Sequence, residues 1–84
     1  MKGIPRIKEV KPIDNMELIV TFDNNIKKRY DIKKLFDKYP IFKDLKVNSL
    51  FNLVRVDCGG YGISWNDEID LSEYEIWNNG EDIN

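Results

Sequence analysis

The sequence predicts a single α+β domain spanning residues 1–84, with an antiparallel sheet of about five short strands and two or three short helices on one face. Three observations predict it. Apolar residues alternate along several short segments, Asn- and Gly-containing turns separate these segments, and two other segments carry apolar residues at helical spacing. A chain of 84 residues has room for one core, and no linker, repeat or low-complexity stretch divides it.

The opening segments predict a three-stranded antiparallel meander. Residues 6–13 are typical of a half-exposed strand. Residues 16–22 form the clearest strand, because apolar side chains with period two share one face: Met16, Leu18, Val20 and Phe22. Asn24-Asn25 predicts a tight hairpin turn, since Asn tolerates a positive φ, and residues 26–30 form the returning strand.

A short helix and a second hairpin are expected next. Asp31 is placed to cap the helix, and Pro40 ends it by disfavouring helical geometry at the residue before it. The apolar stripe of this helix comprises Ile32, Leu35, Phe36 and Tyr39. A further helical turn is expected near residues 48–51. Residues 53–57 and 61–65 predict two short strands joined by a turn at Cys58-Gly59-Gly60.

The last element is a helix with a well-defined beginning. Ser72 and Glu75 fit a capping box, in which the serine accepts a hydrogen bond from the backbone three residues on. Leu71 and Ile76 are spaced for the hydrophobic staple that accompanies such a cap. Asn79-Gly80 predicts the end of the helix. The helix is short, so we expect it to depend on docking against the sheet.

The residue types present exclude several kinds of chemistry. The chain has no His and one Cys, so one chain cannot supply four nitrogen or sulfur ligands to zinc or a Ser-His or Cys-His pair. We therefore expect no enzymatic activity, no metal and no cofactor. Two alternatives remain. The carboxylates of Asp57, Asp67, Glu68 and Asp70 could hold a hard cation. Those of Asp57, Asp67 and Asp70 could instead serve an acid-dependent hydrolase. Turn-forming and strand-end roles are the more usual ones for such residues.

The glycine-rich second hairpin is the candidate partner-binding site. Its candidate residues are Asp57, Gly59, Gly60, Tyr61, Gly62 and Trp65. Tyr61, Ile63 and Trp65 share one strand face, and an exposed row of this kind would form a binding platform, since Tyr and Trp dominate contact sites. The favoured interpretation is different: the row is the core of a small sheet, and the glycines give room to packed neighbours.

Charge is unevenly distributed along the chain. Residues 1–46 carry a net charge of +5 and residues 47–84 a net charge of −7. Such polarity could give a surface that steers a charged partner or pairs head to tail, but the favoured interpretation is that the two halves lie beside each other in the fold and partly neutralise. The basic residues that could contact DNA or RNA are Lys27, Lys28, Arg29, Lys33 and Lys34. Strand alternation splits the first three between two faces, which favours a solvated strand edge instead.

Blocks of residues along most of the chain carry a resemblance. The blocks are Val10-Lys11-Pro12, residues 18–24 and 30–33, Val54-Arg55-Val56-Asp57, Gly59-Gly60-Tyr61-Gly62-Ile63, Trp65 and Ile69-Asp70-Leu71-Ser72. Together they resemble an uncharacterised bacterial family, domain of unknown function 2442. Asn25 stands where members often have Gly, which alters the turn chemistry. The resemblance implies a small α+β domain with no assigned catalytic residues. Some members carry a fused helix-turn-helix domain, and others are encoded beside a second small protein, an arrangement similar to toxin–antitoxin pairs.

These observations favour a noncatalytic protein-binding module, with the antitoxin-like half of a two-gene pair as the narrower hypothesis. The expected partner is another protein, such as the product of an adjacent gene or a second copy of this chain. The alternative is an accessory or regulatory domain associated with DNA or RNA. We expect a cytoplasmic location and no membrane contact, because the sequence shows no secretory signal and no apolar run of about 20 residues.

Overall fold

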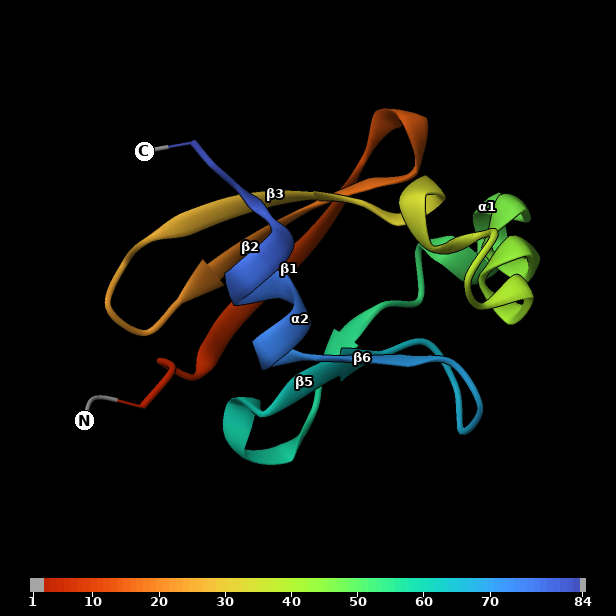
Figure 1. The fold of residues 1–84 in the computed structure, drawn as a ribbon. Coiled ribbons are helices and arrows are strands. Elements are labelled where there is room, and N and C mark those ends of the chain that lie inside the picture. The colour runs from red at the N-terminus through yellow and green to blue at the C-terminus, as the bar shows by residue number, and fades with distance from the viewer. Residues whose placement is uncertain (1–2, 84) are drawn as a thin grey trace.

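Two antiparallel sheets form the framework of the protein (Figure 1). The computed structural model describes residues 3–83. The first sheet has the order β1-β2-β3-β7, and its strands are β1 (Ile7–Ile13), β2 (Glu17–Phe22), β3 (Lys27–Asp31) and β7 (Glu81–Asp82). The second has the order β4-β5-β6, and its strands are β4 (Arg55–Val56), β5 (Gly62–Ser64) and β6 (Asp70–Ser72). The α+β class and the antiparallel pairing are as predicted. The strands are divided between two sheets, and β6 and β7 add to the expected five.

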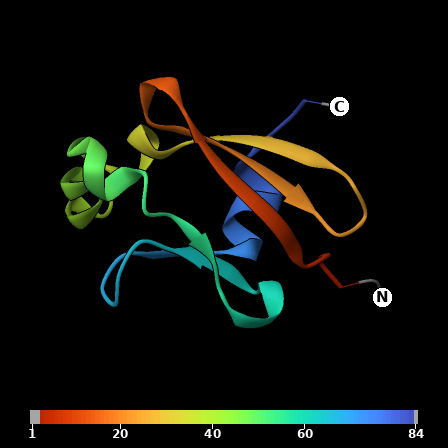
Figure 2. The same ribbon diagram turned by 180° about the vertical axis from the view of Figure 1, so that it is seen from behind.

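Short helices cover the sheets at two places. Helix α2 (Glu73–Asn79) packs against β3 of one sheet and β5 and β6 of the other, and both views show it on one side of the two sheets (Figures 1 and 2). The 3-10 segments η2 (Ile32–Leu35) and η3 (Pro40–Lys46) and helix α1 (Asn48–Phe51) gather at one end of the molecule. Within residues 3–83 there is no helix with the length and apolar character needed to cross a membrane.

Strand β2 is the centre of the core, as its alternation predicts. Leu18, Val20 and Phe22 are fully buried. The strand begins at Glu17 and not at Met16, because Met16 has a left-handed backbone with φ 58°. The turn between β2 and β3 also follows the prediction. Asn25 has φ 70°, and the side-chain oxygen of Asn24 accepts a hydrogen bond of 3.1 Å from the backbone of Ile26.

The predicted helix of residues 32–39 is interrupted: the 3-10 segment η2 ends at Leu35, residues 36–38 form a turn, and a second 3-10 segment, η3, begins at Pro40. Asp31 does cap the first, since its carboxylate accepts a hydrogen bond of 3.0 Å from the backbone N–H of Lys33. Tyr39 lies outside the helical region, with φ −135° and ψ 86°, and Pro40 begins η3. A proline disfavours helical geometry at the residue before it but fits the first position of a helix, so the chain stops and restarts there. This break leaves Tyr39 out of the buried stripe.

Helix α2 has the predicted beginning. The Ser72 hydroxyl accepts a hydrogen bond of 3.1 Å from the Glu75 N–H. Leu71 and Ile76, the two residues of the expected hydrophobic staple, are both buried in the core. The helix ends at Gly80, whose backbone is not left-handed. A Cβ atom on Gly80 would lie 2.6 Å from the Ile76 carbonyl and 3.1 Å from Lys28 Cβ. Glycine is therefore needed here for close approach to β3, where β7 then pairs.

Candidate functional site

The aromatic row of the second hairpin is divided between core and surface. Ile63 and Trp65 are buried, with Trp65 only 2% exposed, whereas Tyr61 is 57% exposed. The Trp65 indole N–H donates a hydrogen bond of 3.0 Å to the Phe51 carbonyl, and its ring meets the Phe42 ring edge-on at 6.2 Å. An exposed row of all three side chains is thus absent: Ile63 and Trp65 lie in the core, as the favoured interpretation expects, and Tyr61 does not. Trp65 is corrected from a candidate contact to a core residue.

The glycines of this hairpin provide close approach between chain segments. Gly60 has φ 75°, and a Cβ atom there would lie 2.5 Å from the Ile7 carbonyl on β1. A Cβ atom on Gly62 would lie 2.7 Å from the Leu71 carbonyl on β6. Gly59 also has a left-handed backbone, with φ 83°. Gly60 and Gly62 are buried, so they shape the hairpin and do not face a partner directly.

Asp57 and Tyr61, the polar candidates of the hairpin, both have partners inside the protein. The Ser64 hydroxyl donates a hydrogen bond of 2.8 Å to the Asp57 carboxylate. The guanidinium of Arg6 lies 4.0 Å from the centre of the Tyr61 ring and donates a hydrogen bond of 2.7 Å to its hydroxyl. Tyr61 therefore ties the N-terminal segment to the second hairpin. Among the described residues 3–83, no three Asp, Glu, Cys or His side chains are grouped so that they could hold a metal ion.

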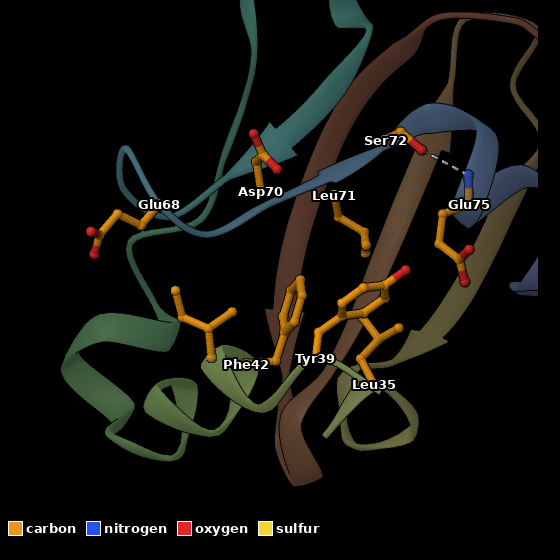
Figure 3. Close-up of a pocket in the computed structure, with 9 residues that line it drawn as sticks. Leu35, Tyr39, Phe42, Glu68, Asp70, Leu71, Ser72 and Glu75 are labelled. Carbon is orange, nitrogen blue, oxygen red and sulfur yellow. Dashed lines mark hydrogen bonds between the residues drawn. The ribbon is translucent and has the colours of Figure 1, made fainter. Parts of the chain in front are cut away.

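A groove of about 360 Å³ lies between β6 and the η2–η3 segment (Figure 3). This volume lies in the range typical of small-molecule pockets. We call it the β6 groove. Its lining residues are Leu35, Tyr39, Ile41, Phe42, Glu68, Asp70, Leu71, Ser72 and Glu75.

Apolar side chains form the floor of the β6 groove. Leu35, Phe42 and Leu71 are buried in the core beneath it, while Tyr39 is 49% exposed and Ile41 is 39% exposed. In Figure 3 the rings of Tyr39 and Phe42 rise from the η2–η3 segment toward Leu71 of β6. Large apolar side chains exposed beside a hollow are typical of contact surfaces. No pattern in the sequence predicts this surface, since Tyr39 continues by its spacing the apolar stripe of residues 32–36.

Acidic side chains surround that floor. Glu68 and Glu75 lie at opposite ends of the β6 groove, and Asp70 points from β6 away from Tyr39 (Figure 3). None of the residues that line the groove is basic. Glu75 is held in place, because the Tyr30 hydroxyl donates a hydrogen bond of 2.6 Å to it. Burial raises the pKa of the Tyr30 phenol, and the hydrogen bond to Glu75 raises it further.

A smaller hollow of about 200 Å³ adjoins the same strand. It is lined by Asp57, Tyr61, Gly62, Asp70, Leu71 and Ser72. The last three residues also line the β6 groove. The exposed part of the predicted hairpin site and the β6 groove therefore meet along β6. What sequence reasoning missed is the contribution of η2 and η3, which are distant in the chain.

The structure does not gather the basic candidates on one surface. Lys28 is only 8% exposed, pairs with Asp82 at 2.8 Å and lies 4.7 Å from the centre of the Trp77 ring. Lys27 and Arg29 point to the other face of β3, as alternation predicts. Arg29 pairs with Glu17 at 3.5 Å. Lys28 is therefore corrected from a candidate nucleic-acid contact to a packed residue.

Lys33 and Lys34 also have partners within the protein. Lys33 pairs with Asp31 at 3.0 Å and donates a hydrogen bond to the Asn15 carbonyl. Lys34 donates a hydrogen bond of 3.0 Å to the Asn79 carbonyl, which links η2 to the end of α2. The contact of these residues with DNA or RNA stays a prediction, and the geometry does not favour it over the solvated-edge interpretation.

Comparison with known proteins places the chain in a family without assigning an activity. A family model described as "Protein of unknown function (DUF2442)" matches residues 7–82, which is nearly the whole chain. No curated protein matches the chain, and no solved structure does.

Proposed function

Because the chain belongs to the DUF2442 family, whose description assigns no activity, we propose from the geometry that it is a noncatalytic protein-binding domain. Its contact surface is the β6 groove. Its occupant is a segment of a partner protein that carries both basic and apolar side chains. The observation that carries this proposal is the exposed, apolar floor of Tyr39 and Ile41 between acidic ends.

The floor supplies the attractive surface. Tyr39 and Ile41 line the groove together with the buried Phe42 and Leu35, so a side chain that enters the groove contacts the core of the domain. Tyrosine is enriched among the residues that contribute most to protein–protein affinity, because a rigid ring buries a large area at little entropic cost. An apolar side chain of the partner would displace water from this floor.

The acidic residues select the charge of the partner. Glu68, Asp70 and Glu75 border the groove without a basic neighbour in its lining. Complementary charge across an interface speeds association and excludes partners of like charge. A basic segment is therefore favoured over an acidic one. Such a segment would also be attracted by the net charge of −7 in residues 47–84.

The narrower form of the proposal is the antitoxin-like half of a two-gene pair, acting in the cytoplasm. The resemblance to a family whose members are encoded beside a second small protein supports it by analogy. The product of an adjacent gene is accordingly the first partner to test. The hairpin residues Asp57 and Tyr61 extend the contact surface along β6 through the smaller hollow.

Calorimetric titration of the purified protein with that neighbouring gene product tests the proposal. We expect a complex that Tyr39→Ala weakens about tenfold or more, the effect of losing one central aromatic contact. Tyr74→Ala is the matched control, because Tyr74 is 65% exposed on α2 and does not line the groove. Glu68→Lys is expected to weaken binding, whereas Glu9→Lys, which makes the same charge change on β1, is expected to leave it nearly unchanged.

Two results would count against the proposal. One is a complex whose affinity is the same for wild type, Tyr39→Ala and Glu68→Lys, since the groove would then lie outside the contact. The other is the absence of any complex with the neighbouring gene product together with no binding of the basic peptide described below.

A further inference from the structure

Strand β6 has an unpaired outer edge. It is the last strand in the order β4-β5-β6, and no strand within residues 3–83 pairs with its outer side. The Trp65 N–H bonds to the Ile69 carbonyl and the Glu73 N–H bonds to the Tyr61 carbonyl, so alternate residues of this segment turn their backbone groups toward β5. In an antiparallel pair, the residues between them turn the same groups the opposite way. The backbone N–H and C=O of Asp70 therefore point away from the sheet.

This open edge borders the β6 groove. Asp70, Leu71 and Ser72 make up β6, and all three line the groove. Leu71 contributes to the apolar floor, and Asp70 lies on the opposite face of the strand (Figure 3). An extended chain bound along this edge would form hydrogen bonds with the unpaired backbone of β6. On one face its side chains would contact the apolar floor of the groove, and on the other face they would contact Asp70.

We propose that the partner segment binds as an additional strand on the outer edge of β6, a mode of recognition that rests on the function proposed above. Side chains of an added strand alternate between the two faces and contact the residues opposite them. The side chains on the face of Leu71 are apolar and enter the groove above Tyr39. The side chains on the other face are basic and pair with Asp70. The recognised sequence therefore alternates basic and apolar residues.

The charges of β6 select a basic partner over a second copy of this chain. A two-fold antiparallel pairing of two β6 edges about Leu71 would place Asp70 of one copy diagonal to Asp70 of the other on the same face. It would also bring together the two sets of Glu68 and Glu75 that border each groove. Like charges on neighbouring strands are destabilising, whereas a basic strand meets complementary charge.

Synthetic peptides with the sequence Lys-Val-Lys-Ile-Lys-Val-Lys serve as the probe. A strand presents alternate N–H groups to its two edges, so N-methylation of either the odd or the even residues blocks one edge and leaves composition and charge unchanged. We expect the unmethylated peptide to bind, one methylated peptide to lose about tenfold or more in affinity, and the other to retain it. A peptide with Glu in place of Lys is expected not to bind.

Substitutions in the protein test the same edge from the other side. Asp70→Pro removes an N–H that points away from β5, at the first residue of an edge strand where proline is tolerated. Asp70→Ala is the control that removes the carboxylate alone. We expect Asp70→Pro to weaken the Lys peptide more than Asp70→Ala does, with circular dichroism showing both variants folded. If Asp70→Pro fails to fold, the methylated pair still decides the question.

The outcomes separate the two proposals. If the Lys peptide binds wild type more tightly than Tyr39→Ala but the two methylated peptides bind equally, strand addition is wrong and groove recognition stands. If the Lys peptide binds wild type and Tyr39→Ala with equal affinity, the groove is wrong, and strand addition falls with it. A mass of two protein copies in light scattering without peptide, lost when the peptide is added, would show that a second copy occupies the edge, and it would overturn the choice of a basic partner over a second copy.

Discussion

The hydroxyl of Tyr30 donates a hydrogen bond of 2.6 Å to the carboxylate of Glu75, which lies 45 residues later in the chain. The bond joins β3 of the four-stranded sheet to helix α2, which also packs on the three-stranded sheet. It also fixes one end of the β6 groove, because Glu75 lines it. This one contact therefore connects the stability of the fold to the shape of the candidate site.

Tyr30→Phe is expected to lower the free energy of unfolding by about 1.5–3 kcal/mol, the range for a hydrogen bond to a charged group. Urea denaturation followed by circular dichroism measures the change. Tyr74→Phe is the matched control, because the Tyr74 side chain is largely exposed, and it is expected to change stability by less than about 0.5 kcal/mol. Equal effects of the two substitutions would show that the Tyr30 hydroxyl contributes nothing specific.

The same bond predicts how stability responds to alkaline pH. The folded protein raises the pKa of the Tyr30 phenol above its ordinary value of 10.0, so the folded state holds this proton more tightly than the unfolded state. The resulting stabilisation is fully present below pH 10.0 and is lost as pH rises above it. We expect the stability difference between wild type and Tyr30→Phe to shrink above that pH, as measured by urea denaturation at a series of pH values. A difference that grew with pH would contradict the assignment.

Gly60→Ala is expected to destabilise the fold by more than about 1 kcal/mol. The left-handed backbone disfavours any side chain there, and the new Cβ atom would meet the Ile7 carbonyl at 2.5 Å. Thermal denaturation measures the loss. Gly3→Ala is the control, since nothing lies within 4 Å of a Cβ at that position. An alanine at position 60 that left the melting temperature unchanged would mean that β1 and the second hairpin are not in close contact.

Removal of the α2 cap by Ser72→Ala is expected to cost about 1 kcal/mol, because the Glu75 N–H loses its acceptor. Ser72→Asp supplies another acceptor and is expected to restore most of the loss. Chemical denaturation of the three proteins makes the comparison. Failure of aspartate to rescue the alanine variant would indicate that Ser72 acts through its contacts in the groove and not through the cap.

The role assigned to Lys28 is structural and can be separated from binding to nucleic acid. Lys28→Ala is expected to destabilise the protein by about 1 kcal/mol, since the ammonium lies over the Trp77 ring and pairs with Asp82. Faster amide hydrogen exchange at β7 is expected with it. In a gel assay at low salt, we expect no shift of DNA or RNA by the wild type. A shift that Lys27→Ala and Arg29→Ala abolish would instead favour the alternative function.

Local patterns in the sequence predict those parts of the fold that depend on near neighbours. The alternation around Val20 predicts β2, Asn24-Asn25 predicts the hairpin turn, and Ser72 predicts the beginning of α2. Each depends on residues within one strand, one turn or one helix. The division into two sheets depends instead on contacts between distant segments, such as the approach of Gly60 to Ile7, and no short pattern encodes it.

The candidate site also depends on contacts between distant segments, so the sequence predicts little of it. Strand β6 has one apolar residue, Leu71, between two polar ones, which is too short to show alternation. Tyr39 fits an apolar stripe by spacing, and only the break at Pro40 turns it outward. The glycines of the second hairpin are visible in the sequence, but their role is close approach within the fold, and the Trp65 side chain contacts η3 and α1.

The acidic residues that border β6 make two processes at its open edge respond to ionic strength in opposite directions: self-association of the protein and binding of a basic strand. In dilute salt, repulsion between carboxylates keeps copies of the protein apart while a basic strand is drawn in. The Debye length falls from about 10 Å at 0.1 M salt to about 3 Å at 1 M, so concentrated salt removes both effects together. High salt would therefore release the basic ligand and also favour slow edge-to-edge aggregation of the purified domain. Dilute buffer would preserve both the solubility of the domain and its binding of the ligand.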